Sequence, residues 1–120
     1  MREDVQKWWE KAKRDLKAAE YNFNGRFFEE ALFLSQQSAE KALKALYISR
    51  LGHLKKTHDL VLLAKKLDLP DHLIDFCKEL SPAYTYSRYP DVPEIKEIKE
   101  VSKNLLQYAK EVLNWVERML

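Results

Sequence analysis

The sequence predicts an all-α protein: an antiparallel, up-and-down bundle of the four-helix type, with three long and two short helices. Apolar residues recur at steps of three and four over long stretches, which is the period of helices with one buried face. Glycine occurs only at positions 25 and 52, and the four prolines lie between the periodic stretches, so a many-turned β fold is disfavoured. With 120 residues, of which 46% are hydrophobic, we expect one helical domain over 1–120.

A first helix is expected from about Glu3 to Phe23. Asn24 and Gly25 end it, and Gly25 suits the left-handed position that follows many helices. We expect at least two of the three tryptophans, at 8, 9 and 115, to be packing residues. The apolar face comprises Val5, Trp8, Trp9, Ala12, Leu16, Ala19 and Phe23, and the other side carries Lys7, Lys11, Arg14 and Lys17 among acidic residues.

The second expected helix, from about Phe27 to Leu51, has the widest apolar face. Small residues recur at 31, 35, 38, 39, 42 and 45. Small side chains on one stripe let another helix come close, so we interpret this segment as the central helix of the bundle. Gly52 ends it.

Two short helices and a long one follow. Thr57 or Asp59 can cap a third helix over about 59–67, and Pro70 suits the first turn of a fourth that reaches about Leu80. Pro82, Pro90 and Pro93 keep the next stretch out of a long helix, although one helical turn is compatible with it. The last helix is expected over about 94–119, with Ser102 and Asn104 on its outer face.

Charge and cysteine content favour a cytoplasmic protein. The net charge of +2 is too small to indicate a dedicated nucleic-acid binder by itself, and Cys77 has no partner for a disulfide. The N-terminus lacks the apolar centre of a signal peptide, and no apolar run reaches membrane-spanning length. We expect no membrane contact, no metal and no cofactor, because the three histidines fit no metal-ligand spacing and no Gly-rich phosphate loop is present.

The segment 84–91, YTYSRYPD, is the strongest candidate for a functional loop, since it places aromatic and charged groups between helical stretches. Arg88 offers paired donors to a phosphate; alternatively, it forms a salt bridge with Asp91 or a glutamate of the second helix that holds the loop in place. Tyr84 and Tyr89 are expected to pack or to line a dimer contact. For Tyr86, the two alternatives are packing and stacking on a base.

Polar residues on the second helix form a further candidate site. Gln37, Lys41 and Lys44, with Glu40 beside them, are expected at a dimer or partner surface or in a cleft near Arg88; the alternative is a solvated stripe held by i,i+4 pairs. His58 is either a capping or packing residue or a general base. Cys77 lies among apolar residues and is interpreted as a core residue.

Three strings resemble one known family. QQSAEKALKAL at 36–46 resembles the second-helix signature of HEPN domains, HDL at 58–60 resembles that family's next element, and SRYPD at 87–91 resembles the third. Their order and spacing extend the resemblance from Trp8 to Leu113, although no single string is specific. The resemblance implies a bundle of four or five helices that often forms a homodimer, beside or fused to a small nucleotidyltransferase, in some cases as a toxin–antitoxin pair.

Many members of that family cut RNA with an arginine and a histidine separated by four to six residues at the dimer cleft. Arg88 fits the arginine, but the positions for the histidine hold Pro93, Glu94 and Ile95. The sequence therefore favours a homodimeric module that acts with a separate nucleotidyltransferase and binds nucleotide or RNA without catalysis of its own. The alternatives are a metal-independent ribonuclease that uses Arg88 with His58 as the base, and a purely structural dimer.

Overall fold

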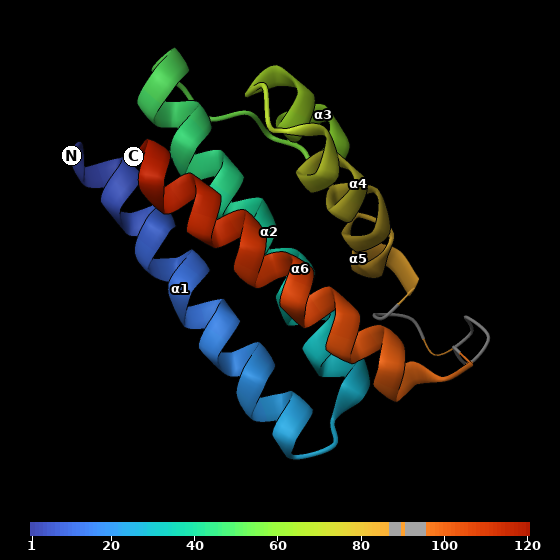
Figure 1. The fold of residues 1–120 in the computed structure, drawn as a ribbon. Coiled ribbons are helices and arrows are strands. Elements are labelled where there is room, and N and C mark those ends of the chain that lie inside the picture. Colours follow the sequence, from blue (N-terminus) through green and yellow to red (C-terminus); the bar gives the residue numbers. More distant parts are fainter. Residues whose placement is uncertain (87–89, 91–95) are drawn as a thin grey trace.

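The computed structural model describes residues 1–86, 90 and 96–120, with the side chain of Tyr86 left out. The chain runs down through α1, up through α2, down through a leg made of α3, α4 and α5, and up through α6 (Figure 1). The up-and-down architecture predicted from the sequence is confirmed. The helices are α1 (Glu3–Asn24), α2 (Phe28–Leu51), α3 (Leu60–Lys66), α4 (Asp71–Leu80), α5 (Ala83–Tyr86) and α6 (Ile98–Met119).

Helix α2 is the central element of the core, as predicted. Four of its alanines, at 31, 39, 42 and 45, are completely buried, as are Leu32, Leu43 and Leu46. The alanines leave room for α1 and α6 to approach the α2 backbone closely. Trp9 and Trp115 are buried and Trp8 packs against the core in part, so the prediction for the tryptophans is confirmed.

The two glycines end their helices differently. Gly52 has the left-handed conformation expected of it, with φ of 83°. Gly25, however, has φ of −81°, and the left-handed residue is Arg26, with φ of 67°. Helix α1 runs one residue further than predicted, and two hydrogen bonds close its end around Arg26, from Arg26 N to Phe23 O and from Phe27 N to Asn22 O.

Replacing Gly52 with alanine is expected to destabilise the protein by about 1–2 kcal/mol, because a Cβ is strained at positive φ. Gly25→Ala is the matched control, because its φ is negative. The tightest contact of the new Cβ is the ring of Phe27 at 3.3 Å, an exposed side chain that can move, and the backbone oxygen of Tyr21 lies at an ordinary contact distance of 3.4 Å. Urea unfolding of both variants measures the difference. Equal losses would contradict the assignment of strain to position 52.

Helix α6 differs from the prediction in two respects. It begins at Ile98 rather than near 94, and Glu97 before it has a left-handed φ of 54°. Ser102 is completely buried, and its hydroxyl has no hydrogen-bond partner among the described residues, so its assignment to the outer face was wrong. Because Ser102 lies seven residues before Ala109, it shares the stripe that faces the core.

The leg α3–α5 is held by local capping. The Asp59 carboxylate accepts hydrogen bonds from the backbone N–H groups of Val61 and Leu62, which confirms one of the two predicted caps. Pro70 is the N-cap of α4 rather than its first residue. The helical turn that the prolines permit is α5, whose Tyr84 ring lies 6.1 Å from the ring of Phe33 on α2.

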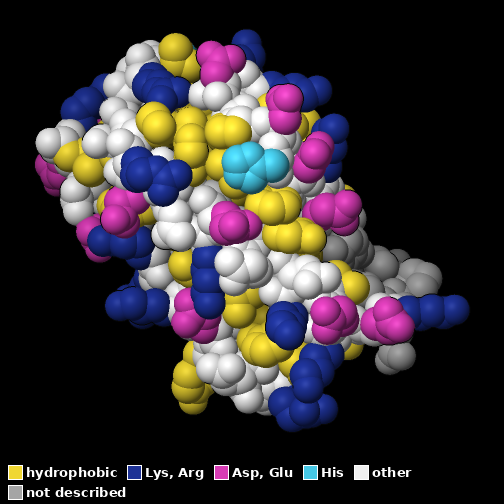
Figure 2. Space-filling view, in the orientation of Figure 1, with side chains coloured by type: hydrophobic (Ala, Val, Ile, Leu, Met, Phe, Trp, Pro, Cys, Tyr) yellow, Lys and Arg dark blue, Asp and Glu magenta, His cyan; other side chains and the backbone are white. Residues whose placement is uncertain are grey.

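The face that carries α6 mixes positive and negative side chains with hydrophobic ones, without a large region of one sign (Figure 2). This distribution agrees with the small net charge of +2. Among the described helices, none has the length and apolar character that crossing a membrane requires.

Candidate functional site

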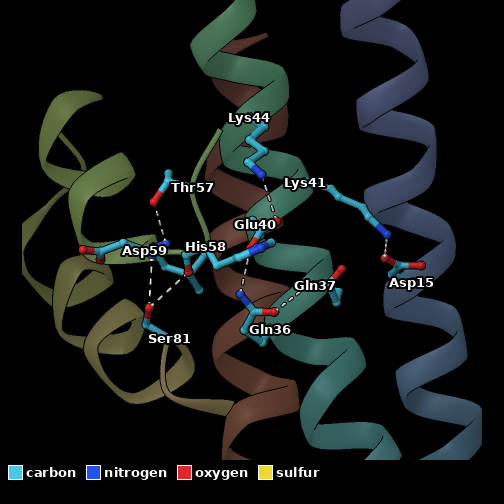
Figure 3. A network of polar contacts seen from close by, with 11 residues as sticks. Asp15, Gln36, Gln37, Glu40, Lys41, Lys44, Thr57, His58, Asp59 and Ser81 are labelled. Atoms are coloured by element: carbon cyan, nitrogen blue, oxygen red, sulfur yellow. Dashed lines mark hydrogen bonds and ion pairs between the residues drawn. The ribbon is translucent and has the colours of Figure 1, made fainter. Parts of the chain in front are cut away.

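The carboxylate of Glu40 is the centre of a buried polar cluster on α2 (Figure 3). Its side chain is only 4% exposed. One oxygen, Oε2, accepts from Lys44 Nζ at 3.0 Å, and the other, Oε1, accepts from Gln36 Nε2 at 3.0 Å. Gln36 and Lys44 stand four residues before and after Glu40, so all three share one stripe of the helix.

His58 completes the cluster from outside α2. Its Nδ1 lies 3.0 Å from Glu40 Oε1, and its ring stacks on that of Tyr84 with 3.8 Å between ring centroids and 16° between the planes. Its side chain is nevertheless 53% exposed. The imidazole is therefore fixed at one edge and on one face, while part of it remains open to solvent.

The linker before α3 places His58 opposite Glu40 (Figure 3). Thr57 Oγ1 accepts from the Asp59 backbone N–H at 3.1 Å, and Ser81 Oγ donates to the His58 carbonyl at 3.4 Å. Ser81 Oγ also accepts from the backbone N–H of Leu60 at 3.2 Å. These contacts join the linker, α3 and the end of α4, and hold the backbone on both sides of His58.

The pairing with Glu40 selects one tautomer of neutral His58. An ionised carboxylate only accepts hydrogen bonds, so Nδ1 carries the hydrogen and Nε2 keeps its lone pair. Among the described residues, Nε2 makes no hydrogen bond with another protein group. A carboxylate that orients an imidazole in this way is the arrangement used in hydrolytic triads, where the outer nitrogen takes a proton. The cluster can thus accept a hydrogen bond or a proton at Nε2.

The residues predicted on α2 pair with different partners. Gln37 Nε2 donates to Gln36 Oε1 at 2.8 Å, and Lys41 extends towards α1, where its ammonium pairs with Asp15 at 2.5 Å (Figure 3). Only Lys44 and Glu40 are paired with each other. Both are buried, with exposed fractions of 6% and 3%, which excludes the solvated-stripe interpretation for this pair.

Sequence reasoning missed three partners of these residues: Gln36, Ser81 and Asp15. The spacing of positions 36, 40 and 44 could have predicted the contact of Gln36 with Glu40, because residues four apart lie on a single stripe of a helix. The pairing of His58 with Glu40 spans 18 positions and comes from the packing of the linker on α2. Ser81 and Asp15 likewise contact the site only through tertiary packing.

The predicted loop falls largely outside the described residues. Arg88, Tyr89 and Asp91 belong to the parts that the structure leaves out, and of Tyr86 only the backbone is described, as the last residue of α5. The predictions for these four residues stay predictions. Tyr84 is described, and its stacking on His58 places the beginning of the loop beside the Glu40 cluster.

The other reactive side chains are placed away from this cluster. Cys77 is completely buried, and burial raises the pKa of its thiol to about 12, so the thiol stays protonated near neutral pH and serves as a core residue, as predicted. The rings of His53 and His72 pack against Tyr47 and Phe76. Within 1–86, 90 and 96–120, no three histidine, cysteine or acidic side chains gather closely enough to hold a metal ion.

Comparison with known proteins gives a consistent result. The family model described as "HEPN domain" matches residues 5–119. No curated protein matches the chain. A solved structure from Thermus thermophilus, TT1696, is 28% identical with a TM-score of 0.90, over 99% of this chain and 100% of that one.

Two further solved structures are similar over nearly their whole length. ST0689, described as an archaeal HEPN homologue, is 33% identical with a TM-score of 0.80, over 98% of each chain. A protein of Thermotoga maritima described as an HEPN domain protein is 26% identical with a TM-score of 0.77, over 93% of this chain and 95% of that one.

Proposed function

Because this chain belongs to the HEPN domain family, we propose that it is a helical module that binds nucleotide or RNA at the surface formed by His58 and Tyr84, with Arg88 as a further contact. The observation that carries the proposal is the His58 ring, which is bonded to the buried Glu40, stacked on Tyr84 and still half exposed. A solvent-facing imidazole fixed in this way offers a hydrogen-bonding edge beside an aromatic ring.

Arg88 supplies the phosphate contact in this proposal. It follows Tyr84 by four residues, and an extended chain spans at most about 3.3–3.6 Å per residue, so chain length limits how far its backbone can lie from Tyr84, the ring that stacks on His58. A guanidinium binds phosphate through paired, charge-assisted hydrogen bonds. Gln37, Lys41 and Lys44 stay outside this contact, because Gln37 bonds to Gln36, Lys44 is buried against Glu40, and Lys41 extends away to Asp15 on α1.

Arg88→Ala is expected to weaken the binding of adenosine 5′-monophosphate (AMP) or a short RNA about tenfold or more, since hydrogen bonds to charged groups contribute about 1.5–3 kcal/mol. Arg14→Ala is the matched control, because Arg14 is exposed on α1. Calorimetric titration measures both variants. Equal affinity of wild type and Arg88→Ala would refute the phosphate contact, and no binding by the wild type at millimolar ligand would refute the proposed function.

We further propose that the module forms a homodimer and associates with a separate nucleotidyltransferase, in a pair of the toxin–antitoxin kind. The support is the family resemblance, in which such pairs recur. Light scattering at high micromolar concentration tests the dimer, and a strictly monomeric mass contradicts it. Co-expression with a nucleotidyltransferase encoded next to the gene tests the partner, and failure of the two proteins to associate counts against it.

A metal-independent ribonuclease is the second candidate, and one observation favours it. Glu40 holds His58 in the tautomer that leaves Nε2 as an acceptor, which a general base requires. His58 would then take the place of the histidine that the sequence lacks after Arg88. Cleavage of a short RNA without metal, lost in both His58→Ala and Arg88→Ala, would establish this function. RNA left intact by the wild type, or cleaved equally by both variants, would exclude it.

A further inference from the structure

A recess on the outer side of α1 and α2 has an aromatic floor and a rim of lysines. It measures about 330 Å³ and is lined by Trp8 with Lys7, Lys11 and Lys41. This volume lies at the lower end of the range of about 300–1,000 Å³ that is typical of small-molecule sites. No carboxylate is among its lining residues.

Trp8 is the one partly exposed tryptophan of the protein. Trp9 and Trp115 are buried, with exposed fractions of 6% and 9%, whereas Trp8 packs against the core and also lines the recess. Lys44 Nζ lies 5.5 Å from the centre of the Trp8 ring. Since Lys44 is only 6% exposed, this cation occupies the protein side of the indole and leaves its outer part to the recess. An aromatic ring supported from within in this way is a platform on which another flat ring can stack.

The lysines keep hydrogen-bonding capacity for an anion. Lys7 pairs with Glu3 at 3.3 Å, but both side chains are more than 70% exposed, so this pair contributes little. Lys41 pairs with Asp15 across the helices, and Lys11 has no ion pair among the described residues. An ammonium group has three donors, so even the paired lysines have donors to spare.

The charge of the rim decides between possible occupants. In a two-fold dimer that used this surface, the same patch would face itself, and the lysines of the two copies would meet without acidic lining residues to offset them. An apolar partner would desolvate the ammonium groups, of which that of Lys11 has no ion pair among the described residues to compensate. A ligand that combines a flat aromatic group with a negative charge satisfies both the indole and the lysines.

We propose that this recess binds a nucleoside monophosphate unit, with its base stacked on Trp8 and its phosphate held by Lys7, Lys11 and Lys41. The inference rests on the proposed nucleotide- or RNA-binding function and adds to it a second contact surface, on the α1 side of α2. The unit is either a free nucleotide or one residue of an RNA chain, and the ligands used in the test distinguish these two sources.

Titration of the ¹⁵N-labelled protein with AMP tests the proposal directly through the three indole N–H signals. The Trp8 signal, assigned with Trp8→Phe, is expected to shift and saturate, while those of the buried Trp9 and Trp115 stay in place. Adenosine and inorganic phosphate, which each lack half of the ligand, are expected to bind at least about tenfold more weakly. An unmoved Trp8 signal at millimolar AMP, or equal binding of phosphate alone, would overturn the proposal.

Two substitutions test the contacts. Lys11→Glu is expected to weaken AMP binding about tenfold or more, and Lys17→Glu, the same charge change at an exposed position of α1 outside the recess, to change it less than about twofold. Trp8→Leu, which keeps an apolar side chain against the core, is expected to cost about 5- to 150-fold through lost stacking. Equal effects of Lys11→Glu and Lys17→Glu would indicate a diffuse charge effect and overturn the site.

Failure of this inference is distinguishable from failure of the proposed function. If Arg88→Ala abolishes AMP binding while the Trp8 signal of the wild type does not move, the recess is excluded and the His58 surface remains. If the Trp8 signal moves and Lys11→Glu weakens binding while Arg88→Ala has no effect, the recess stands and the Arg88 contact is excluded. A trinucleotide of adenylate that moves the Trp8 signal at lower concentration than AMP identifies the occupant as RNA, and the reverse order identifies it as a free nucleotide.

Discussion

Replacing Glu40 with alanine is expected to destabilise the protein by about 3–5 kcal/mol, because it leaves a buried cation without its counter-charge. Lys44 has only 7% of its side chain exposed, and Glu40 is its ion-pair partner at 3.0 Å. The same substitution removes the acceptor of Gln36 Nε2, which is completely buried. Against a total stability of about 5–15 kcal/mol for a typical domain, this loss is large. Urea unfolding followed by circular dichroism measures it.

Two controls separate the burial of the charge from the loss of a carboxylate. Glu10→Ala removes an acidic residue that pairs with Lys13 at the surface, with 53% of the Glu10 side chain exposed, and is expected to cost at most about 1 kcal/mol. The double variant Glu40→Leu with Lys44→Met replaces both charges by apolar groups, and should recover much of the stability lost in Glu40→Ala. A small loss in Glu40→Ala, equal to that of Glu10→Ala, would mean that the ion pair is solvated.

Leu43→Ala is expected to cost about 2–5 kcal/mol by opening a cavity in the centre of the bundle. Leu43 is completely buried on α2, the helix that contacts every other leg. Leu51→Ala makes the same chemical change in the same helix, but Leu51 is 49% exposed, so a change below about 0.5 kcal/mol is expected. Equal unfolding midpoints for the two variants would contradict the placement of Leu43 in the core.

The sequence was sufficient for the architecture because the apolar period of each long helix is unbroken. The expected bounds of the first two helices differ from the observed ones by a single residue at one end of each. The errors in helix ends arose where backbone hydrogen bonds, rather than residue type, decide the end. At the close of α1, the bond pattern assigns the left-handed conformation to Arg26 although the glycine is its neighbour.

The candidate site was predictable only in part. Glu40 and His58 were both singled out, but helical periodicity does not reveal that an acidic residue between alanines is buried with its partners. That outcome depends on the linker, whose return along α2 brings His58 to Glu40 across 18 positions. Conversely, Lys41 was grouped with Lys44 because of its spacing, yet its ammonium forms an ion pair with Asp15 of the neighbouring helix α1. Local spacing identifies the members of a cluster, whereas tertiary packing decides their partners.

The position of Lys44 has a consequence for ligand affinity at the two proposed contact surfaces. Its ammonium lies 5.5 Å from the centre of the Trp8 ring and 3.0 Å from the Glu40 carboxylate that bonds to His58, so one cation is common to both proposed contact surfaces. A ligand that shifts this cation on one side therefore alters the affinity on the other. By thermodynamic linkage the effect is mutual. The first ligand changes the dissociation constant of the second by some factor, and the second ligand changes the dissociation constant of the first by the same factor.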